Sequence, residues 1–101
     1  YLFWSTQRHV FAPAASGWPT GLYGAVSDTL EGPWRLLNGT GLVAETPAAS
    51  PAQTYSWLVL PDRSVTSFVD RWGATNEANF GGTFAPFVHL VIDGDRVTLR
   101  P

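Results

Sequence analysis

The sequence predicts an all-β chain, and three observations carry that prediction. The apolar segments are short and have a period near two, as strands do, rather than the 3.6-residue period of helices. Residues that favour turns, namely Gly, Pro, Asn and Asp, separate these segments. Ten Gly and eight Pro among 101 residues favour a sandwich, a barrel or part of a propeller over a helical bundle.

Two strands are expected in the first third of the chain. Residues 1–6, with the sequence YLFWST, predict an aromatic-rich strand, and residues 21–27, with the sequence GLYGAVS, predict a second one. Both strands are expected to be mostly buried. Trp4 and Tyr23 on these strands, and Trp57 later in the chain, are assigned to the core, because aromatic side chains in a small β protein serve packing first.

Turns are expected after the second strand. Residues 27–34 allow at most one helical turn, because Pro33 disfavours a helix that runs through it. Asn38-Gly39-Thr40 matches a glycosylation sequon, but Asn-Gly is a turn signal in its own right and we interpret it as a turn.

A β-hairpin is predicted in the middle of the sequence. Residues 53–60 and 65–70 are rich in β-forming residues and flank the turn sequence PDRS at 61–64. Residues 44–52 and residues 73–82 are the predicted loops.

A second hairpin is predicted near the end of the chain. Residues 87–92 pair with residues 96–99 across Asp93-Gly94. Glycine accepts the positive φ that a tight turn needs.

Composition and charge exclude several classes of protein. Apolar residues make up 45% of the chain and charged residues 14%, so the chain is expected to fold rather than stay disordered. The net charge is −2 and the six Arg are spread singly, which argues against a nucleic-acid partner. There is no cysteine for a disulfide or a thiolate metal site. The first residues form neither a basic leader region nor an apolar span of about 18 residues, and the chain is expected to be cut from a longer one. No membrane partner is expected.

No metal or cofactor site is expected. The two histidines, His9 and His89, lack a partner at HxxH or HxxxH spacing, and no cysteine completes a zinc set. The sequence has no Gly-rich phosphate loop that opens a helix, which sets nucleotide binding aside. No serine has the G-x-S-x-G context of a hydrolase nucleophile.

The acidic residues do not present an evident catalytic pair. Glycosidic chemistry needs two carboxylates, about 5 to 5.5 Å apart in retaining enzymes. Asp62, Asp93 and Asp95 lie in or beside predicted turns, where Asp is expected for its local hydrogen bonds. Asp70 is the best remaining candidate, yet a carboxylate at a strand end beside Arg71 is more commonly an ion-pair partner.

Polar residues set among aromatic ones indicate two edges of a sugar site. The first edge contains Gln7, Arg8 and His9 near Trp4, and the second is the segment QTYSW at residues 53–57. Aromatic rings stack on the apolar faces of sugars, while amide, guanidinium and imidazole groups bond the hydroxyls. A carbohydrate is therefore the ligand class that these segments favour.

Several stretches, read together, resemble a known family. They are YLFWSTQ at 1–7, GLYGAVSDTLEGPW at 21–34, LNGTGLV at 37–43, QTYS at 53–56, VTSF at 65–68 and GTFAP at 82–86. In residues, order and spacing they are similar to the bacterial levansucrase and inulosucrase family, glycoside hydrolase family 68. The likeness covers nearly the whole chain.

The resemblance implies that residues 1–101 form the C-terminal blades of a five-bladed β-propeller, an incomplete domain cut from a longer protein. Members bind sucrose in a central pocket and transfer its fructosyl unit to water, sucrose or a fructan. They retain configuration through a covalent intermediate on an Asp, with a Glu as acid/base and a further Asp as stabiliser. In the family all three lie upstream of the part seen here, and the D-E-x-x-R segment that carries the Glu is absent from this sequence. The chain alone is therefore expected to be inactive.

Carried over residue by residue, the resemblance selects four positions. Tyr55 matches the tyrosine that hydrogen-bonds the acid/base Glu. Gln7 stands where the family has an Arg or His on the acceptor side of the substrate, and Arg8 and His9 follow it as further substrate-binding candidates. The implied partners are sucrose, fructan oligosaccharides and the remaining propeller blades, and the implied location of the parent is secreted or periplasmic.

Two alternatives stay open at this point. The chain could be a stand-alone β-rich carbohydrate-binding module that uses exposed aromatic side chains. It could also be part of a related propeller glycosidase such as an invertase or an arabinanase.

Overall fold

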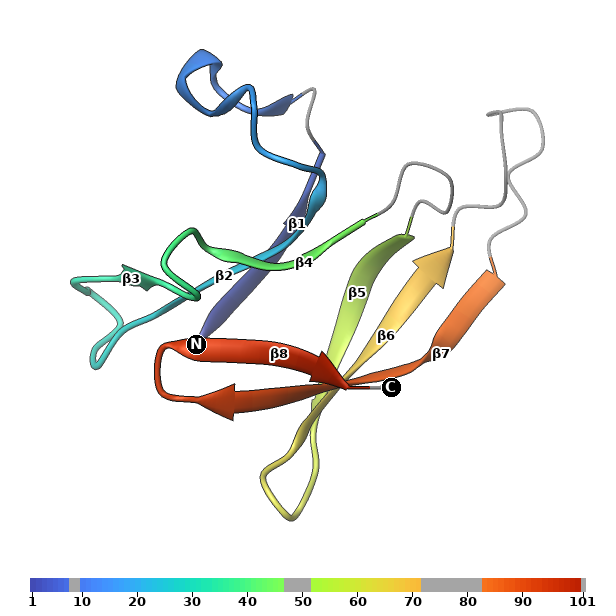
Figure 1. The fold of residues 1–101 in the computed structure, drawn as a ribbon. Helices are drawn as coiled ribbons and strands as arrows, with labels where there is room; N and C mark the ends of the chain where they lie inside the picture. Colours follow the sequence, from blue (N-terminus) through green and yellow to red (C-terminus); the bar gives the residue numbers. More distant parts are fainter. Residues whose placement is uncertain (8–9, 47–51, 72–82, 101) are drawn as a thin grey trace.

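A computed structural model describes residues 1–7, 10–46, 52–71 and 83–100, and within 52–56, 68–71 and 83–88 it describes the backbone only. These residues form two four-stranded antiparallel sheets (Figure 1). The strands of the first sheet are β1 (Leu2–Thr6), β2 (Gly21–Val26), β3 (Arg35–Leu36) and β4 (Leu42–Glu45). Those of the second are β5 (Ala52–Val59), β6 (Val65–Arg71), β7 (Thr83–Asp93) and β8 (Arg96–Arg100). The all-β prediction is confirmed.

The first sheet is built around β2. β1 pairs with one edge of β2, from Leu2 opposite Ala25 to Thr6 opposite Gly21, while β3 and β4 pair with the other edge. With neighbours on both edges, β2 is buried along its whole length, as expected. β1 is an edge strand of this sheet and is only partly buried, so the expectation that both strands are mostly buried is wrong for β1.

Short-range turns connect the strands of the first sheet. A 3-10 turn, η2 (Pro13–Ala15), lies between β1 and β2 and was not predicted from the sequence. After β2 the chain makes a turn in which the Thr29 hydroxyl donates to the Gly32 carbonyl at 2.9 Å. No described helix runs through Pro33, in line with the limit set from the sequence. Asn38 and Gly39 both have positive φ, which confirms the Asn-Gly turn.

Both predicted hairpins are present in the second sheet, whose strand order is β5-β6-β7-β8. In the β5–β6 turn, the Asp62 carboxylate accepts hydrogen bonds from the Ser64 backbone N–H at 2.9 Å and from the Ser64 hydroxyl at 2.6 Å. In the β7–β8 turn, Gly94 has a φ of 59°. The turn roles assigned to Asp62 and Gly94 from the sequence are therefore confirmed.

The predicted loops are shorter than expected where they can be followed. Ala44 and Glu45 belong to β4, and Ala52 begins β5. Residues 47–51 and 72–82 lie outside the described part of the chain. None of the helices that the structure describes is long and apolar enough to cross a lipid bilayer.

The hydrophobic core lies between the two sheets. Its buried members are Val26, Leu37, Leu90 and Val97, and the partly buried Phe3, Val43, Trp57, Val65 and Ile92 pack against them. Both sheets therefore contribute to one core, which fixes how they lie against each other.

The three aromatic residues assigned to the core behave differently. Tyr23 is only 2% exposed, as expected, and Trp57 packs against the core from the side. Trp4 is 37% exposed, so its assignment to the core is wrong. Trp4 and Tyr23 are paired across β1 and β2 and stack on the same face, which differs from the face that carries Phe3.

Candidate functional site

Tyr55 occupies an irregular position in the middle of β5. Thr54 pairs with Val69 of β6, and Ser56 pairs with Phe68, so Tyr55 falls between two rungs of the register. Such a β-bulge bends the strand and redirects side chains, and bulges are common beside active sites. The backbone therefore singles out the residue that the family resemblance selects. The side chain of Tyr55 lies outside the described part of the structure.

A second irregularity lies on the other side of β6 at the same level. Ser67 pairs with Val88 and Val69 pairs with Ala85, so two residues of β7 oppose one residue of β6. Pro86 is one of those two. Because proline has no N–H to donate to a ladder, it is placed at bulges or edges within sheets. The sheet is thus distorted on both edges of β6 beside Tyr55.

Gln7 directly follows the last residue of β1. Its backbone carbonyl accepts a hydrogen bond from the Val10 N–H at 3.0 Å. β1 contacts β5, and Figure 1 shows the C-terminal end of β1 and the N-terminal end of β5 pointing toward the same end of the molecule. Gln7, just after β1, and Tyr55, in β5, are therefore associated with contacting strands of different sheets. Arg8 and His9 lie outside the described residues.

An aromatic cluster supports the loop that begins at Gln7. Phe11 makes edge-on contacts with Trp18 and Tyr23, with ring centroids 5.9 and 5.7 Å apart. Trp18 in turn stacks on Tyr23 at 6.0 Å with an interplanar angle of 13°. Through these rings the loop between β1 and β2 is held against the face of β2 that Tyr23 occupies.

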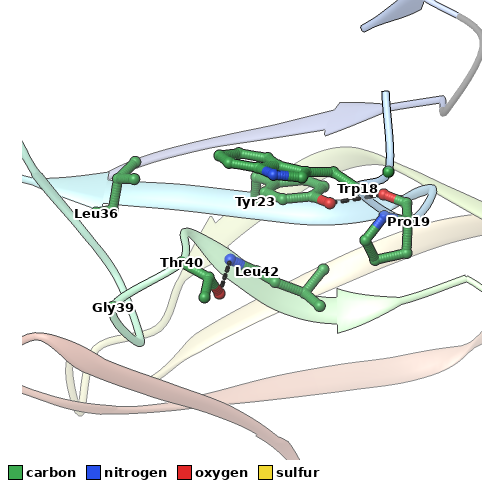
Figure 2. A pocket seen from close by; sticks show the side chains of 8 residues that line it. Trp18, Pro19, Tyr23, Leu36, Gly39, Thr40 and Leu42 are labelled. Atoms are coloured by element: carbon green, nitrogen blue, oxygen red, sulfur yellow. Dashed lines mark hydrogen bonds between the residues drawn. The ribbon is translucent and has the colours of Figure 1, made fainter. Parts of the chain in front are cut away.

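A pocket of about 340 Å³ opens beside this cluster (Figure 2). It is lined by Gly17, Trp18, Pro19, Tyr23, Leu36, Gly39, Thr40 and Leu42. Inside it the Tyr23 hydroxyl donates to the Pro19 carbonyl at 2.6 Å, and the Thr40 hydroxyl oxygen accepts from the Leu42 N–H at 3.3 Å. The lining is aromatic and aliphatic with two hydroxyl groups and no charged side chain, which suits the apolar face of a neutral ligand.

Among the described residues, the pKa shifts and the ion pair each involve one residue and its immediate neighbours. Burial raises the pKa of the Tyr23 phenol, and the charge of Glu45 raises it further, so Tyr23 is a neutral hydrogen-bond donor at ordinary pH. Hydrogen bonds from Ser64 lower the pKa of Asp62. Asp95 makes a two-pronged contact with Arg35, with both nitrogen–oxygen distances at 3.2 Å. These contacts support structural roles for Asp62 and Asp95.

The described residues contain no group of side chains that could bind a metal ion. Within 1–7, 10–46, 52–71 and 83–100, no group of three or more His, Asp or Glu side chains comes together to hold a metal ion.

Comparison with known proteins shows the family to which this chain belongs. The model of glycoside hydrolase family 68, described as levansucrase/invertase, matches residues 1–100. The chain belongs to this family. Among curated relatives it is similar to the levansucrases of Rahnella aquatilis and Erwinia amylovora, at 44% identity over 98 residues, and to that of Zymomonas mobilis, at 40% over 99 residues.

The alignments with these three family members cover 95% of this chain and 23% of each relative, so the chain spans about a quarter of their length. Among solved structures, it is similar to an inulosucrase from Halalkalicoccus jeotgali bound to kestose, with a TM-score of 0.68 and 38% identity. That match covers 96% of this chain and 28% of the inulosucrase chain. It confirms the predicted fold class, part of the β-propeller of family 68.

Two features of the candidate site do not follow from the sequence patterns. The bulge at Tyr55 had no local signal, because it arises from the pairing of β5 with β6. Pro86 inside a strand pattern indicated only the separate irregularity between β6 and β7. The pocket beside Trp18 had no signal, since it depends on how a loop without periodicity folds back onto β2. The roles of Gln7, Arg8, His9 and Tyr55 toward substrate stay predictions.

Proposed function

We propose that the protein to which this chain belongs is a levansucrase-type fructosyltransferase that acts on sucrose. The observation that carries this is the family match over residues 1–100, together with levansucrases as relatives at 40 to 44% identity. The substrates are sucrose and fructan oligosaccharides, and the partner surfaces are the remaining propeller blades. We further propose that the parent is secreted or periplasmic.

The chemistry requires two displacements at one carbon. In the first, an Asp carboxylate bonds to C2 of the fructosyl unit while a Glu protonates the departing glucosyl oxygen. In the second, the Glu takes the proton of water or of a sugar hydroxyl, whose oxygen replaces the Asp and restores the configuration. Both carboxylates belong to the part of the family's sequence that lies upstream of this segment.

The contribution of this chain is to position groups for those steps. Tyr55, at the bulge of β5, is assigned to hold the acid/base Glu by a hydrogen bond and so to set its orientation and protonation. Gln7, at the end of β1, is assigned to the acceptor side together with Arg8 and His9. An amide can donate to one sugar hydroxyl and accept from another, which suits an acceptor that is itself a sugar.

The test is a Tyr55→Phe substitution in the full-length enzyme. Loss of the phenolic hydroxyl is expected to lower sucrose turnover by about tenfold to a hundredfold, which does not exceed the lower limit of what a general acid contributes, because the Glu itself remains. Tyr1→Phe is the matched control, because Tyr1 is exposed and its hydroxyl donates only to the Gly94 carbonyl in the described structure, at 2.8 Å. Turnover that is unaffected in Tyr55→Phe would show that the role assigned to Tyr55 is wrong.

A second candidate function is a stand-alone carbohydrate-binding module, and the pocket of Figure 2 is the observation that favours it. Trp18 is 41% exposed and offers a stacking face there. Calorimetry of the 101-residue chain with sucrose and with a fructan separates the two functions. Saturable binding that a Trp18→Ala substitution removes would favour the module, and no binding is expected if the chain works only as part of the enzyme.

A further inference from the structure

Polar contacts around the β7–β8 turn join the two sheets, in addition to the core. The turn after β3 contains Asn38, in a left-handed backbone conformation with a φ of 54°. The backbone N–H of Asn38 donates to the Asp95 carbonyl in the β7–β8 turn at 2.9 Å. Asparagine tolerates this conformation better than most residues with a Cβ, so the turn presents both its backbone and its side chain to the second sheet.

The side chain of Asn38 pairs with β8 as a neighbouring strand would. Its Oδ1 accepts from the Val97 N–H at 2.9 Å, and its Nδ2 donates to the Val97 carbonyl at 2.9 Å. Nδ2 also donates to the Leu42 carbonyl at 2.9 Å, which ties the same amide to its own sheet. β8 is the last strand in the described order of its sheet, so no described strand pairs with its outer edge. At Val97 the side chain of Asn38 makes the two hydrogen bonds that a neighbouring strand would make.

This contact is better protected than the ion pair beside it. Val97 is only 1% exposed and belongs to the core, whereas the Arg35 and Asp95 side chains that also join the sheets are about half exposed. Exposed ion pairs contribute little to stability, about 0 to 1 kcal/mol, because water and salt screen them. Removing the amide from a partly buried contact would leave two backbone groups of Val97 without those partners.

The position of the contact matters because the two candidate site residues are on different sheets. Gln7 follows β1 of the first sheet, and Tyr55 lies on β5 of the second. A tilt or slide of one sheet against the other therefore changes the separation of these two residues directly. Displacements of about 1 Å at a catalytic constellation can lower rates by about a hundredfold.

We infer that Asn38 is a positioning residue, which fixes the second sheet against the first and thereby sets Tyr55 relative to Gln7. This inference rests on the proposed function for its catalytic consequence, but the contact itself can be tested separately. Asn38 does not touch substrate; it acts through the placement of β8 and of the sheet that β8 closes.

The first experiment measures the contact itself, by hydrogen–deuterium exchange of the Val97 amide in the full-length protein. Asn38→Gly removes the amide and keeps a residue that accepts the positive φ, so faster exchange at Val97 is expected. Asn38→Asp keeps the accepting oxygen but places a second carboxylate oxygen against the carbonyls of Leu42 and Val97, so it is also expected to lose protection. Asp62→Ala is the control, because it removes two turn hydrogen bonds within the second sheet alone. Unchanged exchange at Val97 in Asn38→Gly would overturn the inference.

The second experiment measures the catalytic consequence in the same three variants, at a temperature well below melting. For Asn38→Gly we expect kcat to fall by about tenfold or more while KM for sucrose changes less, because Tyr55 acts on the chemical step. Asp62→Ala is expected to melt earlier and to keep its kcat. Equal kcat in Asn38→Gly and the unsubstituted enzyme would overturn the inference. Absence of sucrose turnover in the unsubstituted enzyme would instead overturn the proposed function and leave the exchange result to stand.

Discussion

Phe3 of β1 and Trp57 of β5 stack across the two sheets, with ring centroids 5.0 Å apart and ring planes at 26°. The pair lies against the buried core residues, so it is the apolar counterpart of the polar contact made by Asn38. Aromatic pairs of this kind contribute about 0.5 to 1.5 kcal/mol beyond the area that they bury. Among the described residues, the interface between the sheets is therefore held by this ring pair, by the aliphatic cluster and by the polar contacts that Asn38 and Arg35 make with the β7–β8 hairpin.

Replacing Phe3 by Ala is expected to lower the free energy of unfolding of the full-length protein by about 2 to 3 kcal/mol. This is below the usual range for Phe to Ala, because Phe3 is only partly buried. Urea unfolding followed by tryptophan fluorescence measures the change. Phe3→Leu keeps most of the volume and should lose less than about 1.5 kcal/mol. Equal losses in the two variants would contradict a role for the ring.

The two glycines Gly21 and Gly17 form a matched pair for a test of close backbone approach. A Cβ at Gly21 would collide with the carbonyl oxygen of Ala44 on β4, a backbone atom that cannot turn aside, whereas a Cβ at Gly17 would meet nothing within 4 Å. Gly21→Ala is therefore expected to cost about 1 to 3 kcal/mol, and Gly17→Ala less than about 0.5 kcal/mol. Thermal melts of both variants measure this. A shift of the same size in both would contradict the close contact between β2 and β4.

Removing the hydroxyl of Tyr23 should change both the stability and its pH dependence. Tyr23→Phe loses the hydrogen bond to Pro19, worth about 1 kcal/mol at neutral pH. The pKa of Tyr23 is raised above its ordinary value of 10.0, chiefly by burial, so the folded state favours the neutral phenol. Its contribution is complete below pH 10.0 and is lost as the pH rises through the folded-state pKa.

The measurement is the denaturation midpoint of both forms from neutral to strongly alkaline pH. The gap between the unsubstituted protein and Tyr23→Phe should close at alkaline pH, because only the former has this phenol to ionise. A gap that stays constant across the whole range would show that Tyr23 does not titrate with unfolding.

The 101-residue chain produced alone is expected to self-associate. Trp4 and Leu36 of the first sheet, and Trp18 in the segment before β2, are exposed. We expect the remaining parts of the propeller to cover them. Exposed apolar patches and open strand edges promote association. Size-exclusion chromatography over a range of concentrations checks this, with the full-length protein as the control. A soluble monomer with a sharp cooperative melt would contradict the expectation.

The local parts of the fold were predictable because short-range chemistry determines them. The turn at Asp62 follows from hydrogen bonds to a residue two positions away, and the turn at Gly94 from a positive φ. The 3-10 turn at Pro13–Ala15 was not predictable, since one turn of helix has no period that a sequence could reveal. The burial of β1 was overestimated, because alternation of residues does not show whether a strand lies at the edge of a sheet.

The site was predictable at the level of residues and not of geometry. The resemblance selected Tyr55, but the bulge at Tyr55 arises from the pairing of β5 with β6, which no local pattern encodes. Asn38 was correctly interpreted as a turn residue. Its bonds to Val97, 59 residues away, depend on how the two sheets meet and so could not be foreseen from its neighbours in sequence.

The amide of Asn38 also has a consequence for the outer side of β8. A terminal strand normally presents free N–H and C=O groups on which a strand of another molecule can begin to grow. At Val97 both the N–H and the C=O are hydrogen-bonded to the side chain of Asn38. A side chain cannot continue the ladder as a neighbouring strand would. A foreign strand cannot form a continuous ladder along β8 without first displacing Asn38, so this residue protects the end of the sheet against fibrous extension.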